Sequence, residues 1–154
     1  MAIILSLETA STTCSAALHD HGILMGTQES LVPQSASSQL SVLINDLLVK
    51  HQIQPNQVDA IAISAGPGSY TGLRIGVATA KGLCYGLGIP LIAVNTLELM
   101  AYEVRNSMGD QEGSLLCPML DARRMEVYCL LTDFQLNILE PTDAKVIEES
   151  SYST

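Results

Sequence analysis

Aromatic and charged side chains are scarce in this sequence of 154 residues. It has no tryptophan and one phenylalanine, and only 15% of its residues are charged, compared with about 25% in an average soluble domain. Because 47% of the residues are hydrophobic, an intrinsically disordered chain is excluded. The length favours one domain and leaves little room for two complete ones.

Basic residues are scarcer than acidic ones. Seven Lys and Arg stand against 16 Asp and Glu, which gives a net charge of −9 at neutral pH. A chain of this charge repels the phosphates of a nucleic acid. We therefore expect any contact with nucleic acid to be made through a partner that supplies positive charge.

Long apolar runs and targeting signals are also missing. Asp, Glu, Gly or Pro interrupts each apolar segment before it reaches the roughly 20 residues that span a bilayer. Residues 1–8 have no basic start and reach Glu8 too early for the apolar core of a signal peptide. These absences predict a cytoplasmic protein without a membrane span.

The four cysteines form no C-x-x-C pair. Cys14, Cys84, Cys117 and Cys129 are far apart and have mostly apolar or small neighbours. The spacing predicts reduced, buried thiols, with a zinc site or a disulfide framework as the alternatives.

Hydrophobic periodicity predicts a mixed α/β domain. Three β-like segments come first, and alternating helices and strands follow them. We predict strands at residues 3–9, 14–19, 22–29, 58–65 and 90–94, and helices ending near residues 50 and 86 and spanning residues 96–106. The order βββαβαβα is typical of a ribonuclease-H-like unit, in which helices cover a mixed sheet.

A second set of strands begins after a polar loop at residues 106–114. Residues 115–120, 126–132 and 135–140 predict another three-stranded meander. The repeat predicts a two-lobed, actin-like architecture, in which residues 1–108 form the first lobe. Residues 109–154 are expected to begin a second lobe that is incomplete.

The sharpest local motif is GPGSYTG at residues 66–72, between a predicted strand and a predicted helix. Its glycines are spaced one residue too widely for the dinucleotide fingerprint, and no Gly-Lys-Ser/Thr of a P-loop follows. A tight turn that permits close packing is one interpretation. An anion site at the start of the helix is the other.

Small residues recur along the helix that follows this motif. Gly72, Gly76 and Ala80 form a narrow strip at i, i+4 spacing. We prefer to interpret it as a helix-to-helix subunit interface, and packing on the protein's own sheet is an equal alternative. Arg74 and Lys81 could face acidic groups of a partner, or they are ordinary solvated charges.

A carboxylate and hydroxyl groups close the first strand, where an actin-like fold binds phosphate and magnesium. Glu8, Thr9 and Thr12 belong to this turn, and Asp121 and Arg123 occupy the corresponding turn of the second meander. A polar hairpin turn is the alternative. The pair His19 and His21 lacks a third ligand nearby, so we predict no metal site.

Four ordered motifs resemble the TsaB family, also called YeaZ. They are ILSLETA with CSAAL, GPGSYTGLRIG, NTLE, and DARRMEVY, and they run from residue 3 to about residue 130. Two residues depart from the common pattern, because Glu8 takes the place of an aspartate and Tyr70 that of a phenylalanine. A histidine frequent near residues 34–38 is missing.

The resemblance implies a non-catalytic protein with the actin-like ATPase (ASKHA) fold. It implies a scaffold for the catalytic paralogue TsaD, joined by the ATPase TsaE, in the bacterial complex that forms threonylcarbamoyladenosine. That modification lies next to the anticodon of tRNAs reading codons that begin with A. Alone, the chain is expected to form a homodimer, and tRNA is contacted indirectly through the complex.

By resemblance, self-association and TsaD binding use the same two helices, at residues 37–50 and 71–86. The expected interface residues are Leu40, Leu43, Ser69, Tyr70, Thr71, Leu73, Arg74, Gly76, Val77 and Ala80. We expect no cofactor of the chain's own, with ATP or ADP bound at most weakly or at the partner interface. The alternative function is an ASKHA ATPase or phosphotransferase that acts on a small molecule.

Overall fold

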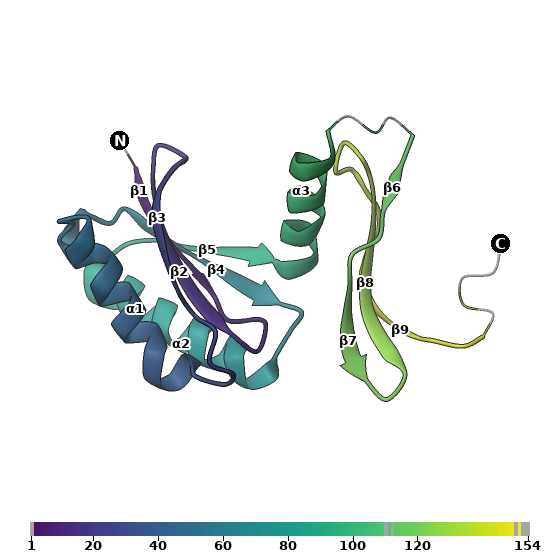
Figure 1. Cartoon of the computed structure of the whole chain (residues 1–154), viewed down its shortest axis with the longest axis horizontal. Coiled ribbons are helices and arrows are strands. Elements are labelled where there is room, and N and C mark those ends of the chain that lie inside the picture. Colours follow the sequence, from purple (N-terminus) through teal and green to yellow (C-terminus); the bar gives the residue numbers. More distant parts are fainter. Residues whose placement is uncertain (1, 110, 112, 150, 152–154) are drawn as a thin grey trace. The chain divides into compact units, whose positions relative to one another are not determined.

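The computed structural model describes residues 2–109, 111, 113–149 and 151. The chain divides into two compact units, Met1–Val94 and Asn95–Thr154 (Figure 1). The predicted lobe boundary at residue 108 stays a prediction, although the helix before it is grouped with the C-terminal unit.

The N-terminal unit contains a five-stranded mixed sheet in the order β3-β2-β1-β4-β5. The pairs β1/β2 and β2/β3 are antiparallel, whereas β1 and β4 are parallel. The predicted ribonuclease-H-like order is therefore confirmed. The elements are β1 (Ile3–Glu8), β2 (Cys14–Asp20), β3 (Ile23–Ser30), α1 (Ala36–Lys50), η1 (Pro55–Gln57), β4 (Ala60–Gly66), α2 (Tyr70–Leu87) and β5 (Leu91–Asn95).

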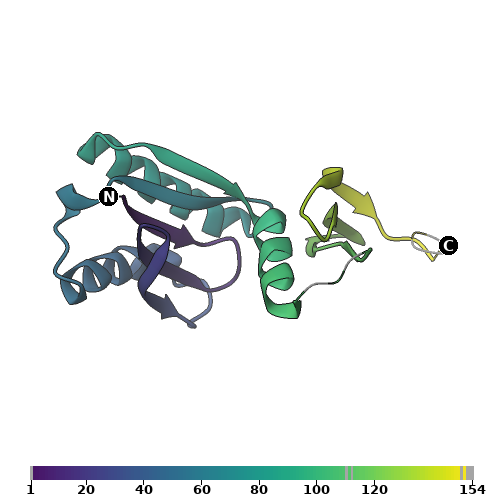
Figure 2. The same ribbon diagram turned by 90° about the horizontal axis from the view of Figure 1, so that it is seen from above.

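Helices α1 and α2 cover one face of this sheet and contact each other. Figure 2 shows the unit from above, with α2 along β4 and α1 beside β2 and β3. Strand residues alternate between faces, so one set points to the helices and forms the core. That core contains Leu5 and Leu7 of β1, Cys14, Ala16 and Leu18 of β2, Ile61 and Ile63 of β4, and the predicted apolar stripe of α1.

The C-terminal unit pairs α3 (Thr96–Met108) with a four-stranded antiparallel sheet. Asn95 caps α3, because its Oδ1 accepts hydrogen bonds from the N–H groups of Leu97 and Glu98. The helix packs on β8 and buries Leu97 and Ala101. The strands are β6 (Leu115–Leu116), β7 (Met119–Arg123), β8 (Glu126–Asp133) and β9 (Ile138–Val146), with β8 paired to all three others.

Two strands of this meander differ from the prediction. The segment 115–120 is split into β6 and β7, because Pro118 lacks an N–H and only its carbonyl accepts, from the Leu130 N–H at 3.3 Å. The last strand begins at Ile138 rather than residue 135. The reason is the turn before it, in which the Asp133 carboxylate accepts from both the backbone and side-chain nitrogens of Asn137.

The four thiols are all free, as predicted. The prediction that all are buried is wrong for Cys117, which is exposed beside Pro118, in the break between β6 and β7. Among the residues described, no helix is both long and apolar enough to cross a membrane.

Candidate functional site

The glycine loop between β4 and α2 lies against the segment that follows β1. The Ser69 N–H donates to the Ala10 carbonyl oxygen over 2.6 Å, and Ser69 Oγ accepts from the Gly72 N–H over 3.3 Å. A Cβ atom at Gly68 would lie within 3.0 Å of Ala10, and one at Gly72 within 3.0 Å of the Thr9 carbonyl oxygen. Real side chains do not pack this closely, so the loop supports the tight-turn interpretation.

The half-buried Glu8 carboxylate at the end of β1 accepts a hydrogen bond on each of its oxygens. Its Oε1 accepts from the Ala10 N–H over 2.6 Å, and its Oε2 accepts from the buried Ser64 hydroxyl on β4. Thr9 is completely buried, and its hydroxyl has no hydrogen-bond partner among the described residues. The structure therefore brings Glu8 and Thr9 together, with Thr9 inside the packed interior and Glu8 half-buried at its edge.

The other predicted nucleotide-site residues are not part of the group formed by Glu8 and Thr9 in the N-terminal unit. Thr12 is exposed on the loop between β1 and β2. Asp121 and Arg123 belong to the C-terminal unit, where Asp121 Oδ1 accepts from the Arg123 N–H over 2.7 Å. Arg123, Arg124 and Met125 have φ values of 68°, 55° and 62°, and this left-handed backbone is uncommon outside glycine. The Asp121 carboxylate thus stabilises the turn in which it lies.

The ten predicted interface residues fall into three classes of exposure. Three exposed residues are available to a partner, three are half-buried, and four are buried in the N-terminal unit. The exposed ones are Tyr70, Thr71 and Arg74, the half-buried ones Ser69, Leu73 and Val77, and the buried ones Leu40, Leu43, Gly76 and Ala80.

The small-residue strip of α2 faces the protein's own sheet. Gly72, Gly76 and Ala80 are buried, and a Cβ atom at Gly76 would collide with the Thr9 hydroxyl and lie 3.1 Å from Ile63 Cδ1. The preferred interpretation of this strip as a seam for another helix is therefore wrong. Any backbone that approaches a helix closely requires the same i, i+4 spacing, whether it belongs to a subunit or to the helix's own sheet.

An exposed stripe on the opposite side of α2 was only partly anticipated. Tyr70, Arg74, Lys81 and Tyr85 lie within about 60° of one another at 100° per residue, and Tyr85 is 94% exposed. The Arg74 guanidinium lies 5.4 Å from the centroid of the Tyr70 ring, and its Nη1 donates to the Tyr70 hydroxyl over 3.4 Å. The helical spacing of Tyr85 from Tyr70 was the signal that could have identified it.

Helix α1 adds two exposed apolar side chains that the sequence prediction also missed. Val42 is 46% exposed and Val49 is 67% exposed. They are seven residues apart, so they lie on the same side of the helix. Their spacing is the same as that of core residues, and only the packing tells the two sets apart.

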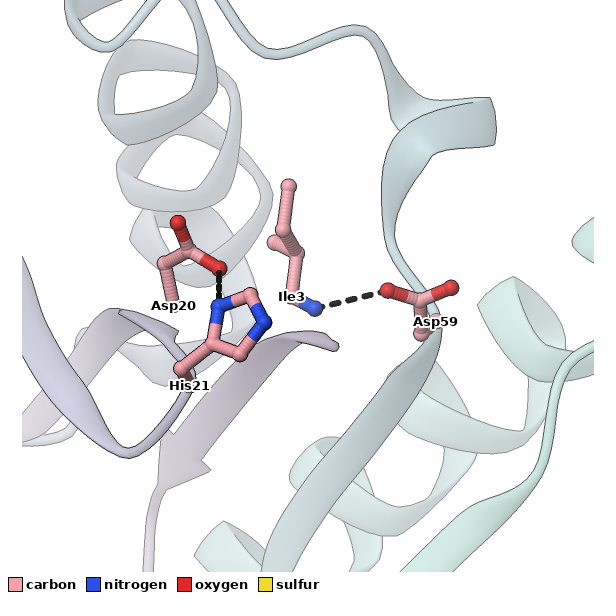
Figure 3. Close-up of polar contacts among 4 residues, drawn as sticks. All are labelled: Ile3, Asp20, His21 and Asp59. Carbon is pink, nitrogen blue, oxygen red and sulfur yellow. Dashed lines mark hydrogen bonds and ion pairs between the residues drawn. The ribbon is translucent and has the colours of Figure 1, made fainter. Parts of the chain in front are cut away.

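The histidine pair lies at the end of β1 opposite to Glu8. His21 Nδ1 lies 2.6 Å from Asp20 Oδ1, beside the Ile3 N–H that donates to Asp59 over 2.7 Å (Figure 3). His19 contacts the Ser6 hydroxyl at 3.5 Å instead. Within the described part of the chain, no three His, Cys, Asp or Glu side chains gather as metal ligands.

Comparison with known proteins identifies the family. Residues 26–154 match the family model described as TsaD, tRNA N6-adenosine threonylcarbamoyltransferase. The chain is 34% identical, over 89% of its length, to the tRNA threonylcarbamoyladenosine biosynthesis protein TsaB of Bacillus subtilis (strain 168). It is also 34% identical, over 81% of its length, to TsaB of Escherichia coli (strain K12). The chain belongs to the TsaB/YeaZ family.

A solved structure supports the same family and the actin-like fold. YeaZ from Pseudomonas aeruginosa superposes with a TM-score of 0.86 at 28% identity, covering 97% of this chain and 70% of that one. The predicted fold class, an actin-like ASKHA fold with a mixed sheet and flanking helices, is therefore confirmed.

The family also has relatives with an enzymatic name. A tRNA N6-adenosine threonylcarbamoyltransferase of Legionella pneumophila (strain Corby) is 33% identical over 82% of this chain and 41% of its own length. The match to TsaB covers 58% of the B. subtilis protein and 52% of the E. coli protein. The chain thus spans little more than half the length of these curated relatives.

Proposed function

We propose that the chain is a non-catalytic subunit of bacterial tRNA threonylcarbamoyladenosine biosynthesis. It binds and stabilises TsaD, with TsaE joining the assembly, and it forms a homodimer when TsaD is absent. The chain has no cofactor of its own, and tRNA meets it only through the complex. The names of the TsaB relatives support the pathway.

The observation that supports the non-catalytic role is the set of hydrogen bonds that the Glu8 carboxylate accepts. In an actin-like fold that binds a nucleotide, this carboxylate must be free to act on phosphate or magnesium. Here both of its oxygens accept hydrogen bonds from Ala10 and Ser64. The glycine loop packs directly on Thr9 and Ala10, which leaves the phosphate corner filled by the protein itself.

The surface that supports partner binding is the outer side of α1 and α2. Tyr70 and Tyr85 on α2 are 74% and 94% exposed, and Val42 and Val49 are exposed on α1. Tyrosine is enriched among the residues that dominate binding energy at protein interfaces. We therefore propose that these exposed residues, supported by the buried Leu40 and Leu43 beneath α1, form the TsaD and homodimer interface.

Co-purification with TsaD, followed by a tRNA threonylcarbamoylation assay with TsaE, tests the proposal. The variant Tyr70→Ala/Tyr85→Ala should lose most TsaD binding and most activity of the reconstituted complex. The control Ile23→Ser removes a side chain that is 72% exposed on β3 and belongs to neither helix, and should leave both TsaD binding and activity intact. Wild-type binding by the tyrosine variant would contradict the proposed surface.

The names of the transferase relatives favour a second candidate, an enzyme of the ASKHA ATPase or transferase type. Glu8→Gln separates the two functions. In a scaffold this change weakens the packing of the β1 end and leaves the activity of the complex in place once folding is ensured. In an enzyme it abolishes turnover. Calorimetry of the chain alone with ATP and magnesium tests the same choice independently. An enzyme should turn ATP over, whereas a scaffold should show no turnover.

A further inference from the structure

The basic residues of the N-terminal unit are confined to its two helices. Lys50, Arg74 and Lys81 are the only Lys or Arg in Met1–Val94, and all three are exposed on α1 or α2. Of the five acidic residues in this unit, only Asp46 lies on either helix. The two helices thus carry a net charge of +2 within a chain whose net charge is −9.

These cations are not neutralised inside the molecule. The ion pairs found among the described residues join His21 to Asp20 and Lys145 to Glu140, and none involves the two helices. The Arg74 guanidinium lies over the Tyr70 ring and donates a hydrogen bond to the Tyr70 hydroxyl, and it forms no ion pair with the residues that the structure describes. Asp46 on α1 offsets one of the three positive charges, and the remaining positive charge is suited to an acidic group outside the molecule.

The spacing of the cations and tyrosines on α2 is suited to binding another protein. Arg74 and Lys81 are seven residues apart, which places them about 10 Å apart along the helix axis, and Tyr70 and Tyr85 extend the stripe to about 22 Å. Exposed tyrosines flank the two cations, and no carboxylate interrupts them on α2. Arg and Tyr are enriched at interface centres, whereas phosphate contacts in nucleic-acid interfaces rely on many more cations.

A second copy that pairs through the same two helices offers the wrong charge to this surface. Its own α1 and α2 also carry +2, with Asp46 as the sole carboxylate. We infer that the outer face of α1 and α2 recognises an acidic protein surface, with carboxylates placed to meet Arg74 and Lys81, in preference to another copy of itself. The inference rests on the proposed function in taking TsaD as the partner to test.

The first experiment measures binding of the full chain to TsaD at several salt concentrations. Affinity should fall as salt rises from about 0.05 M to about 0.5 M, because the Debye length shrinks to a few ångströms. The variant Arg74→Glu/Lys81→Glu should bind about tenfold or more weakly at low salt. The control Arg105→Glu/Arg124→Glu makes the same charge change on exposed residues of the C-terminal unit and should bind like wild type.

The second experiment measures self-association by sedimentation. Wild-type dimers should tighten as salt rises, because screening weakens the repulsion between two positive surfaces. The variant Arg74→Glu/Lys81→Glu reverses the net charge of its helices to −2, so it should pair with wild type more tightly than wild type pairs with itself. Circular dichroism of each variant checks that these exposed changes leave the fold intact.

The outcomes separate this inference from the proposed function. TsaD binding that ignores both salt and charge reversal overturns the inference and leaves the proposed function standing. Absence of TsaD binding under all conditions overturns the proposed function, and sedimentation then decides the inference alone. A wild-type dimer that loosens with salt, or a charge-reversed variant that does not prefer wild type, overturns it.

Discussion

Replacing one glycine of α2 at a time by alanine should have opposite effects at two positions of the same helix. Gly76 is buried against Thr9 and Ile63, whereas Gly82 is exposed and a Cβ atom there would meet nothing within 4 Å. The chemical change is the same, and both positions lie inside the helix. The pair therefore isolates the effect of packing from that of helix propensity.

The magnitudes follow from two opposing effects. Alanine is favoured over glycine inside a helix by about 1 kcal/mol, and Gly82→Ala should stabilise the protein by about that amount. At Gly76 the added methyl group collides with the Thr9 hydroxyl, and overpacking typically costs about 1–3 kcal/mol. Because Thr9 and Ile63 are almost completely buried and packed by other atoms, we expect Gly76→Ala to destabilise by about 1–2 kcal/mol.

A second substitution identifies the atom responsible. Thr9→Ala removes the hydroxyl that the Gly76 methyl group would strike, and this hydroxyl has no hydrogen-bond partner among the described residues. The double variant Gly76→Ala/Thr9→Ala should therefore regain about 1 kcal/mol or more relative to additivity. Gly72→Ala should not be rescued, because its obstacle is the Thr9 carbonyl oxygen, which every residue type retains.

Urea denaturation followed by circular dichroism provides the free energies of unfolding. The reasoning would be refuted if Gly76→Ala and Gly82→Ala shifted stability in the same direction. It would also fail if Thr9→Ala rescued Gly72→Ala as well as Gly76→Ala, since the two glycines would then not contact different atoms.

Three further predictions concern the C-terminal unit. The hydrogen bond from the Asn137 side chain lowers the pKa of Asp133 below its ordinary 3.8. The stabilisation that the ionised Asp133 provides is therefore present above pH 3.8 and is lost as the pH falls through the lowered pKa. NMR titration should show that Asn137→Ala raises the pKa of Asp133. Asn95→Ala removes the α3 cap and the bond to Thr142, and should cost about 1–2 kcal/mol in urea denaturation. Cys117 should be the thiol that a maleimide labels in the folded protein, slowly at neutral pH and faster at alkaline pH, because desolvation raises its pKa; equal labelling of the buried Cys129 would contradict this.

The sequence allowed the element order and the mixed sheet to be predicted because both depend on local periodicity. The apolar residues of α1 from Leu40 to Leu48 recur at helical spacing, and the structure buries them along one side of the helix. Strand ends were less accurate, since the break at Pro118 and the turn at Asp133 depend on individual hydrogen bonds. Such bonds leave no periodic signal.

The candidate site shows a different limit of prediction from sequence. The strip of Gly72, Gly76 and Ala80 correctly indicated a close approach to another backbone, but spacing alone does not say whose backbone it is. Contact with Thr9 decides that it is the protein's own. Glu8 had the chemistry of a phosphate site, and only its partner Ser64, 56 residues away in the chain, shows that the carboxylate is already engaged.

The contacts of the glycines with Thr9 also fix the rotation of α2 about its own axis. An inserted or deleted residue between Gly68 and Gly76 would turn the rest of the helix by about 100°. Bulky side chains would then face Thr9, and the glycines would face solvent. The length of this segment therefore determines which residues of α2 the protein displays, and Tyr85, about two and a half turns beyond Gly76, is exposed because Gly76 cannot point anywhere else.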